Sequence, residues 1–193
     1  GVTTHGGFAS LSLVSADNVH PIGDIGFSRA ALAEPMGCVL NGVNAVHAPW
    51  MEEALIFGAG PMGLLMGMAL RAQGVSKVAF ADISENRLAL AAGFDFEAVA
   101  SGSANLDKWQ SRADLVVEAT GVPAVAAKLT SYMANGGKGL YFGVCPSYAR
   151  IKISPFEVFR RQLTLAGSHS LNHNIPRALE VIAGLGSQAD QVV

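Results

Sequence analysis

The sequence predicts an α/β fold in which helices cover both faces of a doubly wound, six-stranded parallel sheet. Short apolar runs alternate regularly with helical stretches from residue 54 onward, and these runs are almost continuously apolar. Continuous apolar runs are typical of parallel strands that are buried on both sides. The chain also contains 22 glycines, which suits a main chain that turns tightly. Half of the residues are hydrophobic and only 15% are charged, which excludes a disordered chain.

The alternation predicts the order of the elements. Strands are expected at residues 54–57, 77–82, 96–100, 114–119, 139–143 and 163–167. The right-handed crossover rule arranges them in one sheet in the order 3-2-1-4-5-6. Helices are expected at residues 62–73, 84–92, 123–133, 155–160 and 175–183. The crossover at residues 101–112 is polar and has a poor helical pattern.

The first 50 residues follow a different pattern. Residues 6–14 alternate at period two and predict an antiparallel strand outside the sheet. Ser28 is a candidate N-cap of a short helix. A second helix is expected to begin with Pro35 at its first position, because proline inside a helix costs about 3 kcal/mol. We therefore predict two units, residues 1–50 and residues 51–193.

The charges and cysteines restrict the partners and the compartment. Thirteen basic residues against fifteen acidic ones give a net charge of −2 without a basic patch, so nucleic acid and anionic membranes are not expected partners. Cys38 and Cys145 do not form a C-x-x-C pair, and we expect both to be buried thiols of a reduced, cytoplasmic protein. The chain begins at Gly1 in strand-like sequence, which indicates part of a longer protein.

The glycine-rich motif G-A-G-P-M-G follows the first strand, opens the first long helix and begins at Gly58. Gly58 permits a tight turn, Gly60 lets the main chain approach a pyrophosphate, and Gly63 lets the helix pack closely against the strand. The free N–H groups at the start of a helix bind phosphates. Because Pro61 has no N–H group, Met62 and Gly63 are the expected donors.

An acid, Asp82, stands at the end of the second predicted strand. It can accept hydrogen bonds from both ribose hydroxyls of an adenosine and would repel a 2′-phosphate, so it favours NAD over NADP. A G-x-G-x-x-G motif also occurs by chance, and an acid at a strand end is often an ordinary turn residue. The complete order of strand, turn, helix, strand and acid favours dinucleotide binding. A methyltransferase that uses S-adenosylmethionine shares this arrangement and is an alternative.

Four segments resemble the zinc-dependent medium-chain dehydrogenases, most closely the sorbitol and other polyol dehydrogenases. They are the G-A-G-P-M-G turn, "VVEATG" on the fourth strand, "GGFA" ahead of "ALAEP", and "GGKGLYFGV" on the fifth strand. The resemblance implies a Rossmann domain that binds NAD, preceded by a fragment of a mainly β catalytic domain. It implies hydride transfer between nicotinamide and a zinc-bound alcohol, polyol or ketone. A dinucleotide-binding module without catalysis is the other alternative.

By position, the resemblance implies further cofactor contacts. Arg87 would lie near the adenine or the ribose, although it is equally a solvated helix residue. Thr120 and Gly121 follow the fourth strand, where the carboxyl edge of the sheet meets a cofactor. Gly143 and Val144 follow the fifth strand, against which the nicotinamide is expected to lie. A homo-oligomer is expected, because the edge of the sixth strand can pair with a second copy.

The resemblance also implies a catalytic zinc ion. In this family its ligands, a cysteine and a histidine–acid pair, precede the segment that corresponds to "GGFA", so the catalytic residues are expected upstream of Gly1. In polyol-type members the acid of the "E-P" motif, here Glu34, approaches the zinc. Alternatively, Glu34 caps the helix that begins at Pro35. Without the other ligands, the isolated chain is expected to be inactive.

Overall fold

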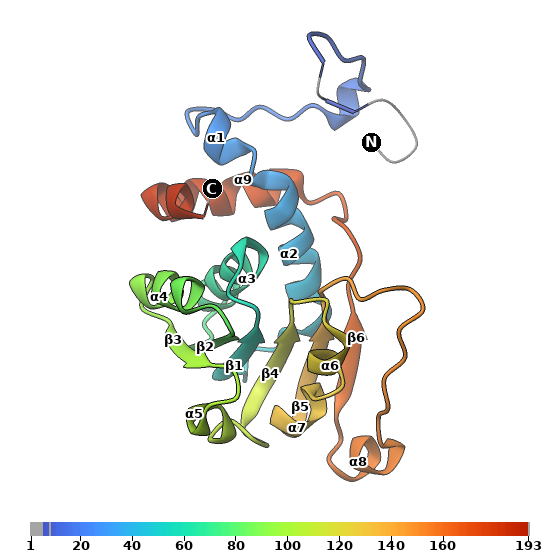
Figure 1. Cartoon of the computed structure of the whole chain (residues 1–193). Coiled ribbons are helices and arrows are strands. Elements are labelled where there is room, and N and C mark those ends of the chain that lie inside the picture. The colour runs from blue at the N-terminus through green and yellow to red at the C-terminus, as the bar shows by residue number, and fades with distance from the viewer. Residues whose placement is uncertain (1–5, 8, 193) are drawn as a thin grey trace.

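The computed structural model describes residues 6, 7 and 9–192 (Figure 1). Its centre is a six-stranded parallel sheet with the order β3-β2-β1-β4-β5-β6, which confirms the predicted fold and strand order. The strands are β1 (Glu53–Phe57), β2 (Lys77–Asp82), β3 (Glu97–Ala100), β4 (Ala113–Glu118), β5 (Met133–Tyr141) and β6 (Thr164–Gly167). The described part of residues 1–50 contributes no strand to this sheet.

Two layers of helices cover the sheet. The helices are α1 (Phe27–Ala30), α2 (Ala33–Val46), α3 (Pro61–Ala72), α4 (Glu85–Gly93), α5 (Ala104–Asp107), α6 (Pro123–Ala126), α7 (Leu129–Tyr132), α8 (Pro155–Arg160) and α9 (Ile175–Leu185), with short 3-10 helices η1 (Ala16–Asn18) and η2 (Gly186–Gln191). Apolar residues of α2, α3, α4 and α9 form one core with the sheet, and those of α5, α7 and α8 pack on the other face.

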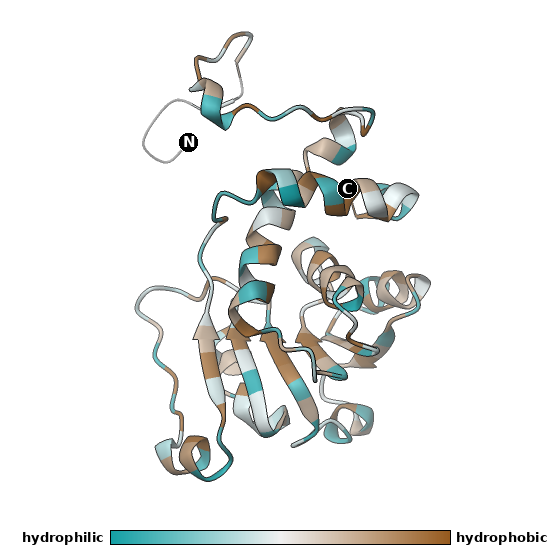
Figure 2. Ribbon diagram, turned by 180° about the vertical axis from the view of Figure 1, so that it is seen from behind, coloured by the Kyte–Doolittle hydropathy of each residue, from teal (hydrophilic) through white to brown (hydrophobic). Residues whose placement is uncertain are grey.

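The strands are apolar on both sides because successive side chains enter opposite cores. Figure 2 shows hydrophobic residues, in brown, along the strands of the sheet. On β1, Ile56 belongs to the core under α3, whereas its neighbour Leu55 belongs to the core under α7. Both side chains are completely buried. This is the physical reason for the continuous apolar runs in the sequence. The long helix α2 lies against α3 and α9 (Figure 1), so it packs on the same core as the glycine-rich turn.

The N-terminal strand prediction is wrong for the described part of residues 6–14. Residues 6, 7 and 9–14 form no strand, and the side chains of Leu11 and Leu13 are 91% and 101% exposed. A strand needs a neighbour for its main-chain hydrogen bonds, and no described segment pairs with this one. Residue 8 lies outside the described residues.

The predicted helix starts are corrected as well. The short helix α1 has Gly26, not Ser28, at its N-cap. The following helix α2 begins at Ala33, and Pro35 lies inside its first turn. Proline is tolerated there because the first four N–H groups of a helix have no acceptor within it.

The segment 123–133 forms two short helices, α6 and α7, instead of one. The second ends at Tyr132 because Met133 becomes extended and pairs with Ala113 as the first residue of β5. This strand therefore begins six residues earlier than the predicted 139, and its register shifts between Ala113 and Leu115. Sheet pairing overrides the local helical pattern at this point.

Candidate functional site

The glycine-rich turn connects β1 to α3 at the carboxyl edge of the sheet. Gly58 has φ +105°, a conformation that favours glycine. A Cβ atom on Gly63 would lie 1.9 Å from the carbonyl oxygen of Gly58, so only glycine lets the helix fold back onto the turn. A Cβ atom on Gly60 would meet nothing within 4 Å. The turn therefore packs tightly against the helix at Gly63, whereas the space beside Gly60 is free of protein atoms.

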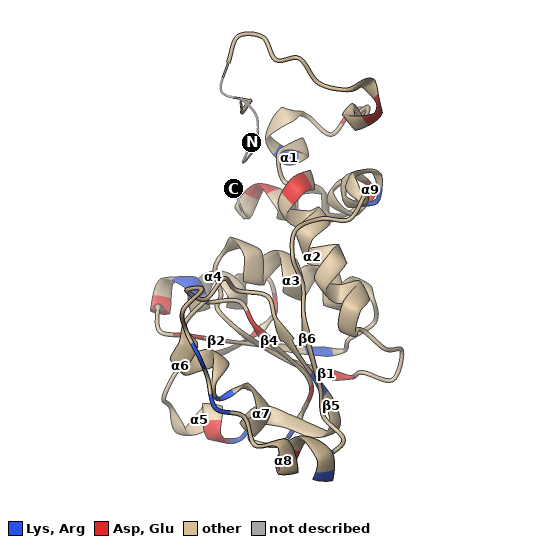
Figure 3. Cartoon of the chain, turned by 90° about the vertical axis from the view of Figure 1, so that its right-hand side faces the viewer, with Lys and Arg blue, Asp and Glu red and all other residues tan. Residues whose placement is uncertain are grey.

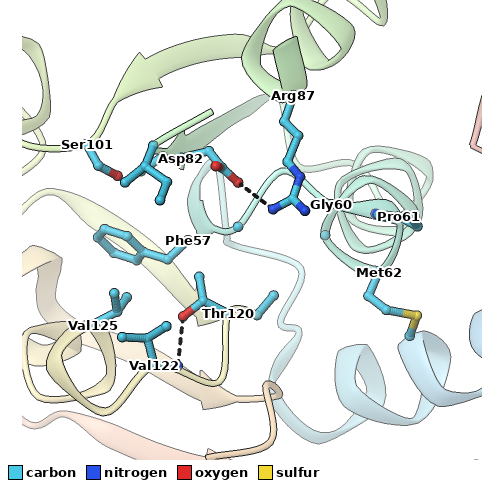
Figure 4. Close-up of a pocket in the computed structure, with 15 residues that line it drawn as sticks. Phe57, Gly60, Pro61, Met62, Asp82, Arg87, Ser101, Thr120, Val122 and Val125 are labelled. Carbon is cyan, nitrogen blue, oxygen red and sulfur yellow. Dashed lines mark hydrogen bonds and ion pairs between the residues drawn. The ribbon is translucent and has the colours of Figure 1, made fainter. Parts of the chain in front are cut away.

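Asp82 ties this turn to the start of α4. Its carboxylate is 6% exposed and accepts hydrogen bonds from the N–H of Ala59, at 2.8 Å, and from the N–H of Ser84, at 2.9 Å. The guanidinium of Arg87 points toward it, with 3.9 Å between Nη1 and Oδ2 (Figure 4). Each carboxylate oxygen has two lone pairs, so both oxygens keep the capacity to accept one more hydrogen bond.

A cavity of about 400 Å³ lies between the turn, Asp82 and the end of β4 (Figure 4). Eight of the residues expected to contact a cofactor line it, namely Gly58, Gly60, Pro61, Met62, Gly63, Asp82, Arg87 and Thr120. Ser101, which follows β3, also lines it and was not identified from the sequence. These residues lie at the ends of four strands, β1, β2, β3 and β4, so the sheet brings together segments that are distant in the chain.

A second cavity, of about 320 Å³, continues from the first. Gly143 and Val144 line it, as do Phe142, Cys38 and the segment 168–170 after β6. Both cavities share Met62, Ala119 and Thr120 as lining residues. Together they form one path that runs from Asp82 past the glycine-rich turn to the ends of β5 and β6.

The turns after β4 and β5 interlock beside this path. Gly121 has φ +71°, and a Cβ atom there would lie 2.6 Å from the carbonyl oxygen of Val144. A Cβ atom on Gly143 would lie 2.3 Å from the nitrogen of Gly121. Gly121 lines neither cavity and instead allows the two turns to approach each other. Thus Gly143 and Val144 line the second cavity, whereas Gly121 packs against the main chain of Val144 without lining the cavity.

Glu118, at the end of β4, is a completely buried acid that the sequence analysis missed. Its Oε1 accepts hydrogen bonds from the N–H and the hydroxyl of Thr120 and from the N–H of Gly121. Its carbonyl oxygen accepts from the N–H groups of Phe142 and Gly143. Burial, and then the negative charge of Glu118, raises the pKa of Tyr141. An acid within the apolar run "DLVVEAT" is the signal that could have identified this residue.

Glu34 lies in the first turn of α2, one helical turn before the cavity-lining Cys38. The thiol of Cys38 donates to its carboxylate at 3.4 Å. Burial, followed by this hydrogen bond, raises the pKa of Cys38 from 9.0 to about 11. Cys38 is half-buried and faces the second cavity, and Cys145 is half-buried too, so neither is the fully buried thiol that we expected.

The described residues do not make a complete metal site. Within residues 6, 7 and 9–192, no three His, Cys, Asp or Glu side chains come together as a metal ion requires. Glu34 and Cys38 supply two donors at most. A zinc ion therefore does not fit the described part of this chain by itself.

Figure 3 shows Lys and Arg residues distributed over several elements of the chain. Among the helices that the structure describes, none combines the length and the apolar character that crossing a membrane requires.

The chain is similar to known dehydrogenases. It is 47% identical over 186 residues to the D-altritol 5-dehydrogenase of Agrobacterium fabrum, covering 94% of this chain and 55% of the relative. It is 30% identical over 203 residues to the D-arabinitol dehydrogenase 1 of Uromyces fabae, covering all of this chain and 58% of the relative. The chain thus spans somewhat more than half the length of these curated relatives.

A solved structure and a family model agree with these relatives. A Sinorhizobium meliloti protein described as a zinc-binding dehydrogenase, solved with NADP bound, superposes with a TM-score of 0.72 at 25% identity. The match covers 81% of this chain and 48% of that one. The family model for zinc-binding dehydrogenases matches residues 61–184, from the start of α3 to α9. The chain belongs to the zinc-binding dehydrogenase family.

Proposed function

We propose that this chain is the NAD(H)-binding domain of a zinc-dependent oxidoreductase that transfers hydride between nicotinamide and an alcohol or polyol. The observation that carries the proposal is the path of two adjoining cavities, with the open Gly60 beside it and Asp82 at one end. The names of the polyol dehydrogenases among the relatives support the substrate class.

The residues of the path fit the parts of a dinucleotide. Asp82 would hold the ribose of the adenosine half, with Arg87 beside it. The pyrophosphate would lie at the start of α3, where Met62 and Gly63 line the cavity and the helix dipole favours an anion. The space at Gly60 lets a phosphate approach the main chain. The nicotinamide would enter the second cavity, against Gly143 and Val144.

The bound cofactor would supply the hydride chemistry, and this chain would supply binding and orientation. Glu118 keeps the turns after β4 and β5 together, so the walls of the second cavity are preorganised. The described residues do not by themselves hold the zinc ion that the family name implies. We propose that Glu34 approaches this metal only in the complete enzyme.

The remaining expectations extend this proposal. Residues 1–50 would belong with a catalytic domain, and residues 51–193 would form the cofactor domain. The protein would act as a cytoplasmic homo-oligomer, which the position of β6 at the edge of the sheet supports.

Cofactor choice tests the proposal most directly. We expect the chain to bind NADH about a hundredfold more tightly than NADPH, a difference of about 2.8 kcal/mol. Charge-assisted hydrogen bonds from the ribose hydroxyls to Asp82 contribute roughly 1.5–3 kcal/mol each at best, and a 2′-phosphate replaces them with repulsion. Asp82→Ser should bring the two dissociation constants together, as measured by isothermal titration.

Glu85→Gln is the matched control, because it removes an exposed charge in the first turn of α4 without touching the cavity. It should leave the ratio of the dissociation constants unchanged. Two outcomes would show that Asp82 only stabilises the turn and does not select the cofactor. They are equal binding of NADH and NADPH by the parent chain, and a ratio of their dissociation constants that Asp82→Ser does not alter. Binding of S-adenosylmethionine in place of NADH would support the methyltransferase alternative.

A further inference from the structure

The second cavity has a wall that does not come from the sheet. Helix α2 supplies Cys38, and the segment 168–170 after β6 supplies the facing side. Residues 168–174 pass α2 as a loop before α9 begins. How this loop is fixed on α2 therefore determines the shape of the cavity.

Asn41 fixes the first half of the loop. It lies on α2, nearly one turn after Cys38, and is half-buried. Its Nδ2 atom lies 3.0 Å from the carbonyl oxygen of Ser170, 3.4 Å from that of His169 and 3.4 Å from the hydroxyl of Ser168. The amide NH₂ group has two protons, so the three acceptor oxygens share these two donors. One side chain thus contacts all three loop residues that line the cavity.

A second asparagine fixes the other half of the loop. Nδ2 of Asn174 donates to the carbonyl oxygen of Gly37 at 2.7 Å. A Cβ atom on Gly37 would lie 3.0 Å from Oδ1 of Asn174 and 3.2 Å from the Cβ of Leu171. Glycine at this position therefore lets the loop approach the helix closely. Two independent contacts hold the same loop against α2.

The loop has a conformation that needs such support. Ser170 and His173 have φ of +59° and +51°, in the left-handed region that non-glycine residues rarely adopt. These conformations persist only where neighbouring structure holds them. The carbonyl of Ser170 that Asn41 binds belongs to one of these two residues.

We propose that Asn41 is a positioning residue for the nicotinamide half of the cofactor, acting through the main chain of residues 168–170. This inference rests on the proposed function, which assigns the nicotinamide to the second cavity. Asn41 does not line either cavity, so it acts through the loop and not by direct contact. Its effect is confined to one end of the path, because no residue of α2 or of the segment 168–170 lines the first cavity.

ADP-ribose tests this restriction, since it contains the adenosine, the pyrophosphate and the second ribose but lacks the nicotinamide. We expect Asn41→Ala to weaken NADH binding roughly tenfold, while ADP-ribose binding stays within about twofold of the parent chain. The nearly isosteric Asn41→Asp cannot donate and turns a carboxylate toward carbonyl oxygens, so it should weaken NADH binding at least as much. Asn174→Ala should show the same pattern.

Asn44→Ala is the matched control, because Asn44 is an exposed asparagine on the same helix. It should bind both ligands as the parent chain does. Equal NADH affinities of Asn41→Ala and Asn44→Ala would overturn the inference, as would a parallel loss of NADH and ADP-ribose. Loss of the folded state in all the variants at Asn41 and Asn174, measured by circular dichroism, would make Asn41 a structural residue and would also overturn it. If the parent chain bound neither ligand, the proposed function would fail first, which keeps the two failures distinct.

Discussion

Two glycines of the turn after β1 have opposite surroundings. Gly60 has φ −75° and ψ 179°, which alanine can adopt, and its Cβ position is open. We expect Gly60→Ala to change the free energy of unfolding by less than about 1 kcal/mol and to weaken NADH binding at least tenfold, because the methyl group would occupy the space for the phosphates. Thermal unfolding and titration measure the two effects separately.

Gly63→Ala should show the opposite pattern. The added methyl group would overlap the carbonyl oxygen of Gly58, and such overpacking costs roughly 1–3 kcal/mol or more. We expect a clearly lower unfolding midpoint for Gly63→Ala than for Gly60→Ala. The same midpoint for both variants would contradict the assignment of a packing role to Gly63.

The thiol of Cys38 gives a prediction that depends on pH. Its pKa is raised to about 11, mainly by burial, so the protonated form predominates in the folded protein through neutral and mildly basic pH. In a Cys145→Ser background, alkylation by iodoacetamide should accelerate about tenfold per pH unit from pH 8 to 10. In urea the rate should level off near pH 9, where an unfolded thiol titrates. If the alkylation rate of the folded protein also levelled off near pH 9, burial would not raise the pKa of Cys38.

At the scale of elements, a tryptophan holds the polar crossover between β3 and β4. Trp109 is 1% exposed, its Nε1 donates to Glu97 on β3 at 3.2 Å, and the guanidinium of Arg112 lies 4.9 Å from its ring centroid. Only one short helix, α5, forms in this crossover, so the anchor is a side chain and not a regular element.

Trp109→Ala should therefore lower the free energy of unfolding by about 3–5 kcal/mol, as expected for a buried aromatic residue. Trp50→Ala is the control, because Trp50 is 53% exposed and its loss should change stability by less than about 0.5 kcal/mol. Urea unfolding followed by circular dichroism measures both. Similar midpoints for the two variants would show that the crossover does not depend on Trp109.

At the scale of the whole molecule, we expect the isolated chain to bind NADH without oxidising alcohols or polyols, with or without zinc. A catalytic zinc ion has three protein ligands, and the described residues bring no such set together. The absorbance of NADH formed from a polyol such as D-altritol measures turnover. Zinc-dependent turnover in a preparation free of host enzymes would show that the metal site had been missed.

The sequence by itself determined the unit from β1 to β2, with its glycine-rich turn and Asp82. Within this unit the signals are local, because strand, turn, helix and acid follow each other within 30 residues (53–82). It also determined the strand order, because parallel strands joined by right-handed crossovers have few possible arrangements. The continuous apolar runs indicated in advance that helices cover both faces.

Only the tertiary structure decided how the second cavity is closed. Ser170 in its wall is held by Asn41, 129 residues away in the sequence, and no local pattern reports such a contact. Pairing between Met133 and Ala113 likewise ended α7 and extended β5 against the local helical pattern. Residues 6, 7 and 9–14 of the alternating segment formed no strand, because a strand depends on a partner that its own residues do not specify. The local sequence predicts an element whose main-chain hydrogen bonds form within the element itself. Where another segment must supply those hydrogen bonds, the tertiary structure determines whether the element forms.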